Sequence, residues 1–323
     1  MGRYLIRRSL FLLLVVVLIS VFTFLIFMKL PSGDPARRNA GRATTPETIH
    51  EVRVALGLNK PLWVQYGRFA KGLIPWPGFW MNEQVYFSWS DNVPVWEELK
   101  QRIPVTAALA IGAAAFWMIL GVPIGIASAI RRRSLVDRGG MLFALLGVSL
   151  PVFWLGYVFI FVFSIKIPIL PGAGIPSDEN TIQAVLHGRF LMPWLVLMLS
   201  FAAFYARMTR GNLIETMTED YIRTARAKGL SERRVIFKHG LRAALTPVVT
   251  MFGMDLGILL GGAVITEQVF NLNGIGKYLV DSLTRQDFPA TMGVTVFASF
   301  FIVIANLVVD ILYAFLDPRV RYT

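Results

Sequence analysis

The sequence contains no cysteine and only three histidines in 323 residues. Disulfide bonds and thiolate metal sites are therefore excluded, and the three histidines lie in different predicted loops, which argues against a metal centre. Charged residues are also scarce, at 16% of the chain, whereas roughly 25% is typical of soluble domains. Together with 55% hydrophobic residues, this composition indicates a protein that is solvated by a lipid bilayer.

Long runs with little or no charge show where the chain can cross the membrane. A transmembrane helix needs about 20 predominantly apolar residues to span ~30 Å of hydrocarbon. Four runs contain no charged residue and two contain one aspartate each: Ser9–Met28, Ile103–Ile130, Gly139–Ile165, Phe190–Ala206, Ala243–Thr266 and Phe288–Leu316. The first run is longer than the apolar part of a signal peptide, so we interpret it as an anchor. We predict an all-α polytopic membrane protein with six transmembrane helices.

Basic residues outnumber acidic ones, 32 to 20, and their distribution predicts the orientation. Short cytoplasmic loops carry an excess of lysine and arginine. A cytoplasmic N-terminus places on that side Arg3, Arg7, Arg8, Arg131, Arg132, Arg133, Arg138, nine basic residues from Arg207 to Arg242, Arg319 and Arg321. The C-terminus is then cytoplasmic too, and the net charge of +12 needs no nucleic-acid partner. We divide the chain into residues 1–30 (N-terminus and first span), an extracytoplasmic segment 31–102, and a five-helix core 103–323.

The extracytoplasmic segment carries signals for short helices. Pro46 at a first helical position and Gly57 as a stop predict one helix. A second is indicated after Pro61, where Leu62, Gln65, Tyr66 and Phe69 follow helical spacing. Trp76, Trp80, Trp89 and Trp96 suggest elements at the membrane surface, where amphipathic aromatic side chains prefer to lie, and packing against the outer ends of the spans is the favoured interpretation.

Asp255 and Asp310 are the ionisable residues of the predicted membrane core. Such residues usually face a bundle interior or an aqueous path. Asp310 lies near a predicted cytoplasmic end and is interpreted as structural. Asp255, near the middle of its span, is the candidate for lining a translocation pathway. Ion relays usually pair several such groups, so two isolated aspartates make a weak relay.

The basic loop at about 207–243 carries local signals for two helices. Asp220 can cap the first and Gly229 can end it in the left-handed conformation, while Ser231 can cap a second that runs to Pro247. The small side chains of Thr224, Ala225 and Ala227 would let another protein approach the first helix, and Arg223, Arg226 and Lys228 could meet an acidic rim. A docking surface and a solvated basic face are both open on this pattern.

The same loop resembles the cytoplasmic coupling loop of ABC importer permeases, which carries Glu-Ala-Ala followed by a glycine. Arg223-Thr224-Ala225 and Gly229 fit that frame, and the whole run from Asp220 to Ser231 is similar to the dipeptide, oligopeptide and nickel branch. Further similar strings follow in the same order: Gly33-Asp34-Pro35, Ala55 to Leu62, Ser149 to Leu155, Gly261 to Glu267, Val269-Phe270, Gly274 to Gly276 and Leu316 to Arg319.

This resemblance implies a permease subunit with the type I importer architecture in a bacterial cytoplasmic membrane. It implies as partners a homologous second permease, two cytoplasmic ATPase subunits, and an extracytoplasmic binding protein that delivers peptides, with nickel chelates or oligosaccharides as alternative substrates. The implied coupling residues are Asp220, Arg223, Thr224, Ala225, Arg226, Ala227, Lys228 and Gly229. No cofactor is expected on this chain, since ATP and magnesium would bind the partners. Gly274 to Tyr278 lacks the glycine spacing and the Ser or Thr of a phosphate-binding loop.

Two rival functions need features that the sequence barely supplies. An ion-coupled secondary transporter would transport alone and would need a relay of titratable groups within the spans. A membrane-embedded protease would need a nucleophile and a base, and Ser149 has no histidine in any predicted span to activate it. We therefore predict a transport subunit that is not itself an enzyme.

Overall fold

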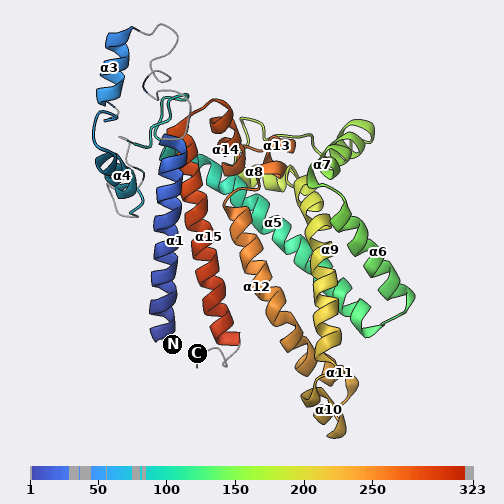
Figure 1. Ribbon diagram of the computed structural model, residues 1–323. Coiled ribbons are helices and arrows are strands. Elements are labelled where there is room, and N and C mark those ends of the chain that lie inside the picture. The colour runs from blue at the N-terminus through green and yellow to red at the C-terminus, as the bar shows by residue number, and fades with distance from the viewer. Residues whose placement is uncertain are drawn as a thin grey trace.

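The computed structural model describes residues 2–28, 36, 45–55, 57–74, 81 and 85–316, which are mainly helical (Figure 1). Within these ranges, β-structure is limited to one isolated bridge between Phe87 and Pro94. Several residues of the sequence analysis lie outside the described residues: Gly33, Asp34, Pro35, Trp76, Trp80 and 317–323, together with the side chain of Asp310.

Five helical runs of the described chain are long and apolar enough to cross a membrane. They belong to α1 (Gly2–Met28), α5 (Val95–Ile130), α9 (Leu191–Thr216), α15 (Phe288–Leu316) and a composite run, Glu232–Leu260. The prediction of an integral multi-pass helical protein is therefore confirmed. α5 begins eight residues before the expected Ile103, because Pro94 precedes it and Glu97 and Glu98 favour its positive N-terminal end.

The expected third span is not one straight helix. It consists of α6 (Leu135–Ser149), α7 (Val152–Ile160) and the π-helix η1 (Phe161–Lys166), and the two halves meet at an angle of 96°. Pro151 has no backbone N–H and disfavours helical geometry in the residue before it, so Leu150 is extended, with φ −92° and ψ 124°. The run Gly139–Ile165 is therefore a broken span or a re-entrant segment.

The composite run also differs from its prediction. It joins α11 (Glu232–Arg234), the π-helix η2 (Val235–Gly240) and α12 (Leu241–Leu260). Pro247 was expected to end the helix after the basic loop, but it lies inside α12. Proline is tolerated in membrane helices because neighbouring groups satisfy the freed carbonyl. The run ends at Leu260 rather than Thr266, because Gly262 adopts φ +134° and turns the chain.

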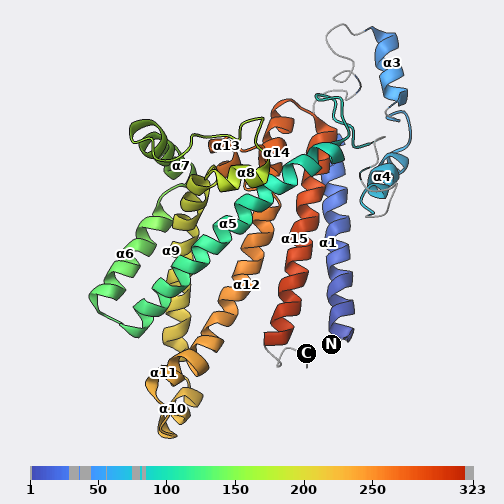
Figure 2. The same ribbon diagram turned by 180° about the vertical axis from the view of Figure 1, so that it is seen from behind.

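Short helices gather at the two ends of the bundle. Figures 1 and 2 show the start of α1 and the end of α15 on the same side of the bundle as α10 (Asp220–Ala227). At the opposite side lie α3 (Pro46–Ala55), α4 (Leu62–Lys71), α8 (Thr181–Leu186), α13 (Val264–Val269) and α14 (Ile275–Thr284). The helices predicted at Pro46 and Leu62 are thus confirmed.

The core is aromatic where α5, α9 and α12 meet. Trp117 is fully buried and stacks on Phe201 with ring centroids 4.6 Å apart, and Phe252 meets it edge-on. Glycines bring the helices this close: a Cβ at Gly125 would lie 2.5 Å from the Ala206 carbonyl oxygen. Small residues at such contacts are typical of membrane helix pairs. This packing fixes the relative positions of α9 and α12, which carry the candidate site.

Candidate functional site

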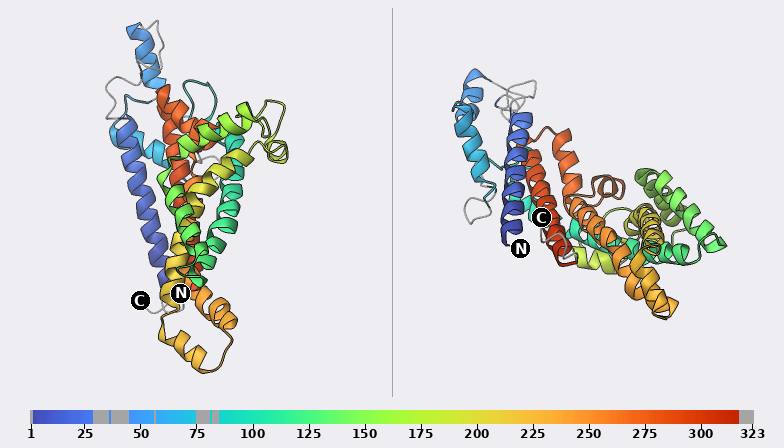
Figure 3. Two further views of the ribbon diagram at one scale, coloured as in Figure 1. Left: turned by 90° about the vertical axis from the view of Figure 1, so that its right-hand side faces the viewer. Right: turned by 60° about the horizontal axis from the view of Figure 1, so that its bottom comes forward.

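The loop singled out in the sequence folds into a helical hairpin at the end of the molecule. α10 projects beyond the membrane-crossing helices, as the left view of Figure 3 shows. Gly229 ends it with φ +75°, as predicted. The predicted cap is wrong by one residue: Glu219 occupies the N-cap without a side-chain hydrogen bond. Asp220 begins the helix instead, and its exposed carboxylate accepts a hydrogen bond from Arg223 at 3.2 Å.

α10 has an inner face that anchors it to its own chain. Ile222 is fully buried and Ala225 is 7% exposed, and both pack with Val235 of η2. Residues three apart share a helix face, so these two side chains point the same way. The prediction that Ala225 belongs to the approachable surface is therefore wrong, because Ala225 belongs to the packing that holds the hairpin together.

The outer face of α10 carries more basic than acidic side chains. The exposed residues of the helix and its C-cap are Asp220, Tyr221, Arg223, Thr224, Arg226, Ala227 and Lys228. The Arg226 guanidinium donates from Nη2 and Nε to the Glu232 carboxylate, at 2.7 and 3.1 Å, and these bonds brace the turn around Gly229. The Glu232 hydrogen bonds also raise the pKa of Arg226 above its ordinary value, which keeps its charge.

The hairpin is connected mechanically to the spans. A cavity of about 240 Å³ separates it from the ends of α5 and α9, and Arg132, Met217 and Ile236 are among its lining residues. α11, η2 and α12 form one continuous helical run, so the segment that packs on α10 through Val235 continues directly into α12. Asn212 of α9 donates to the Ala244 carbonyl at 3.3 Å, which couples α9 to the same run.

A buried ion pair ties the α5–α6 turn to α9. Asp137 accepts hydrogen bonds from Arg210 Nε at 2.5 Å and Nη2 at 2.9 Å, and from the Arg133 backbone N–H at 2.8 Å. The Asp137 side chain is 7% exposed. Neither residue was singled out in the sequence, although an aspartate beside a run of arginines at a predicted turn was a usable signal.

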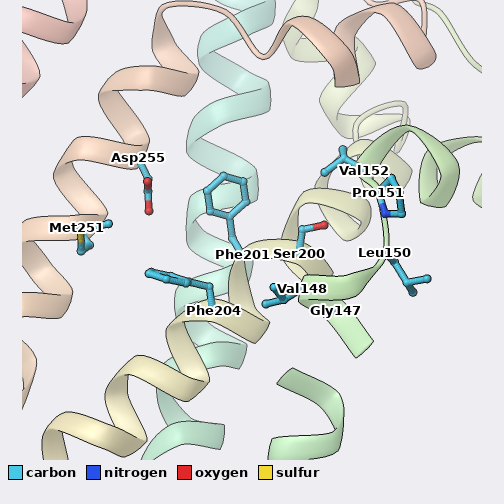
Figure 4. Close-up of a pocket in the computed structure, with 10 residues that line it drawn as sticks. All are labelled: Gly147, Val148, Leu150, Pro151, Val152, Ser200, Phe201, Phe204, Met251 and Asp255. Carbon is cyan, nitrogen blue, oxygen red and sulfur yellow. The ribbon is translucent and has the colours of Figure 1, made fainter. Parts of the chain in front are cut away.

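Asp255 lies within α12 and faces a cavity of about 500 Å³ between α12, α9 and the α6–α7 bend (Figure 4). The Tyr205 hydroxyl of α9 donates to Asp255 Oδ2 at 2.7 Å. Phe201, Phe204 and Met251 line the cavity near the carboxylate, and Ser200 lies farther along the wall. The structure thus brings the pathway candidate to a cavity.

Glu267 is a residue that sequence reasoning missed. It is fully buried in α13, where Oε1 accepts from the Thr106 hydroxyl and Oε2 accepts from the Lys277 backbone N–H, both at 2.8 Å. Thr106 Oγ1 also accepts from the Ile275 N–H at 2.8 Å. Glu267 and Thr106 therefore cap the first turn of α14, whose own N-cap is Gly274. The available signal was an acidic residue shortly before a glycine-rich helix start.

Burial raises the pKa of the Glu267 carboxyl above its ordinary value, against the hydrogen bonds from Lys277 and Thr106, which lower it. The space around the carboxyl is tight, because any side chain at Gly274 would collide with it. α13 and α14 also approach closely at their backbones, where a Cβ at Gly276 would lie 2.8 Å from Val264. The two helices form one compact unit over the end of α5.

Comparisons with known proteins cover nearly the whole chain. Residues 121–322 match the family described as binding-protein-dependent transport system inner membrane component. Residues 1–110 match the N-terminal part of binding-protein-dependent transport system membrane components. The dipeptide transport system permease protein DppB of Escherichia coli K12 is 36% identical over 329 residues, covering 94% of each chain. The glutathione transport system permease protein GsiC of Salmonella paratyphi A is 38% identical over 322 residues, covering 100% of each.

A solved structure shares the fold. A chain of the MetNI methionine ABC transporter, in an inward-facing conformation, superposes with a TM-score of 0.53 and 18% identity. The match covers 69% of this chain and 97% of that one. At 18% identity, this similarity shows a shared arrangement of helices. The remaining part of this chain has no counterpart in that structure.

Proposed function

The chain belongs to the family of binding-protein-dependent transport system inner membrane components, and we propose that it forms, with a homologous second permease, the path by which peptides enter the cell. As a member of this family it is a permease subunit of an ABC importer, and not the ATPase. The observation that carries the proposal is the match of both family segments, 1–110 and 121–322, to a chain whose basic hairpin projects from one end of the bundle.

The proposal includes six spans with both termini in the cytoplasm, in the type I importer architecture, counting the bent α6–α7 pair as one span. α10 lies on the same side of the bundle as the start of α1 and the end of α15, which supports this topology, because the basic segments then share one side. Residues 1–30 hold the first span, 31–102 form the extracytoplasmic segment and 103–323 form the core. The membrane is the bacterial cytoplasmic membrane, as expected for relatives from Escherichia coli and Salmonella.

The outer face of α10 is the proposed contact for the ATPase subunits. Arg223 and Lys228 offer charge, while Thr224 and Ala227 leave room for close approach. Asp220 and Gly229 bound the helix, and Arg226 braces it through Glu232. Two ATPase subunits carrying ATP and magnesium would drive this chain and its homologue between two arrangements.

Peptides are the proposed substrates, delivered by an extracytoplasmic binding protein. The names of two relatives, a dipeptide permease and a glutathione permease, support this class, since glutathione is itself a peptide. Asp255 is the proposed polar residue of the path, because the carboxylate faces the cavity between α12, α9 and the α6–α7 bend.

Reconstitution tests the proposal. The chain is placed in liposomes with its second permease, ATPase subunits and binding protein, and ATP-dependent peptide uptake is measured. Ala227→Arg should abolish uptake and ATPase co-purification, because it puts a bulky charge on the outer face of α10, whereas Ala227→Ser should preserve both. Uptake by the isolated chain under a proton or sodium gradient, or unchanged ATPase binding by Ala227→Arg, would contradict the proposal.

A further inference from the structure

The carboxylate of Asp255 has no cation to balance it within the described part of the chain. Its one hydrogen bond there is the 2.7 Å contact from the neutral Tyr205 hydroxyl, and no lysine, arginine or histidine of that part lies within ion-pair distance. A charge inside a membrane protein is costly unless a partner or an aqueous cavity compensates it. Within the described residues, the cavity that Asp255 lines is therefore where a compensating group can reach the carboxylate.

The surroundings of the carboxylate suit an organic cation. Phe201 and Phe204 line the same cavity, and Figure 4 shows both rings on the side where Asp255 points. Phe201 is held by its stack on Trp117 at 4.6 Å, and Phe204 by an edge contact with Tyr205 at 5.8 Å. Fixed aromatic faces attract ammonium groups through their quadrupole, and a carboxylate adds a charged hydrogen-bond acceptor.

The size and lining of the cavity suit a short peptide. Its volume is about 500 Å³, within the roughly 300–1,000 Å³ of small-molecule sites. Beyond the carboxylate, its wall is formed by apolar and small residues, including Gly147 and Val152, with the Ser200 hydroxyl as a further polar group. A single charged anchor in an otherwise apolar wall would hold one end of a ligand while leaving its side chains unselected.

We infer that this cavity receives the α-ammonium group of a peptide, with Asp255 as its counter-ion and Phe201 and Phe204 as its aromatic wall. This inference rests on the proposed function, since it identifies the end of the substrate that the path recognises. One ion pair near aromatic faces provides orientation without tight retention, which suits a site that must release its ligand. Peptides that lack a positive amino terminus should then cross without help from Asp255.

The chain offers a direct test because it contains no cysteine. Ser200→Cys places a single thiol of this chain in the cavity wall. In the purified complex, labelling of this thiol by a small maleimide is measured as an increase in the mass of this chain. A dipeptide with a free amino terminus should slow labelling, whereas its N-formyl derivative should not. Adding Asp255→Asn should remove the protection, and adding Asp255→Glu or Tyr205→Phe should preserve it, because both keep the carboxylate.

Import provides the second measurement. In reconstituted transporters, Asp255→Asn should lower uptake of the free dipeptide about tenfold, or ~1.4 kcal/mol, and leave uptake of the N-formyl peptide unchanged. The same binding protein serves wild type and variant, so its own preference cancels in their ratio. Equal slowing of both peptides would show a structural role, and loss of assembly would show that Asp255 is needed to form the complex; both outcomes overturn the inference. If the wild type imports no peptide at all, the proposed function fails instead.

Discussion

Replacing Glu267 by alanine should loosen the α13–α14 unit. The change removes the acceptor for the partly buried Lys277 N–H and for the buried Thr106 hydroxyl, both at 2.8 Å in the native chain. Each buried donor left unsatisfied costs about 1–3 kcal/mol, so Glu267→Ala should destabilise the unit by about 4 kcal/mol.

Glu267→Gln is the matched control. Its carbonyl oxygen can accept from the Lys277 N–H, and its amide can donate to Thr106 Oγ1, which also accepts from the Ile275 N–H. Only the direction of one hydrogen bond changes, so a cost of about 1 kcal/mol is expected. The two variants therefore differ by ~3 kcal/mol, or about a hundredfold in the equilibrium for local opening.

Hydrogen exchange of the assembled protein measures this opening, because the backbone amide of Lys277 exchanges when α14 separates from α13. Peptides covering the start of α14 should exchange about a hundred times faster in Glu267→Ala than in Glu267→Gln. Equal exchange in the two variants would refute the assignment of Glu267 as the cap of α14. Thr106→Val, which leaves the Ile275 N–H without its acceptor, should also accelerate exchange, whereas Thr106→Ser should not.

The same residue predicts a pH dependence. Because burial raises the pKa of Glu267 above 4.5, the folded state favours the protonated carboxyl. Its contribution to stability is fully present below pH 4.5 and is lost as the pH rises through the folded pKa. As the pH rises from 4.5 to the folded-state pKa, the thermal midpoint of the wild type should therefore fall relative to that of Glu267→Gln. A constant difference between the two proteins across the range would be inconsistent with this titration.

Three further predictions concern the ends and interfaces of the helices. Arg210→Ala should lower the unfolding free energy by about 3 kcal/mol, because it leaves the buried Asp137 carboxylate without its cation. Asp137→Ala should cost less, because the Arg210 side chain is 25% exposed, and the double variant should cost less than the sum of the two; additive losses in thermal unfolding would contradict this. Gly125→Ala should reduce stability because its Cβ would meet the α9 backbone, whereas Gly211→Ala, with no atom within 4 Å, should not, as compared by yield and thermal midpoint. Gly229→Ala should cost about 1 kcal/mol at φ +75° and Gly229→Asn less; equal thermal midpoints for these two variants would show that backbone strain is not the cause.

Sequence signals that act within a short stretch of the chain predicted the corresponding helices correctly. The left-handed glycine at 229, the proline at the start of α3 and the helical spacing after Pro61 all act within one or two helical turns, and each predicted helix is present. The same locality explains two errors. The run Gly139–Ile165 was predicted as one span, yet it bends by 96° at Pro151, whereas Pro247 was taken as a stop and lies inside α12. Whether a membrane helix continues through a proline depends on its neighbours, which a local pattern does not contain.

Composition and charge by themselves determined that this chain is a multi-pass helical membrane protein, because the hydrocarbon core admits only long apolar segments whose backbone is hydrogen-bonded within the helix. Tertiary structure decided which way individual side chains face. Ala225 packs inward against Val235, Asp255 accepts a hydrogen bond from Tyr205 fifty residues away, and Glu267 accepts one from Thr106 at a separation of 161 residues. Such contacts depend on how helices rotate and pack against one another, and glycines and aromatic rings from distant parts of the chain settle that rotation together.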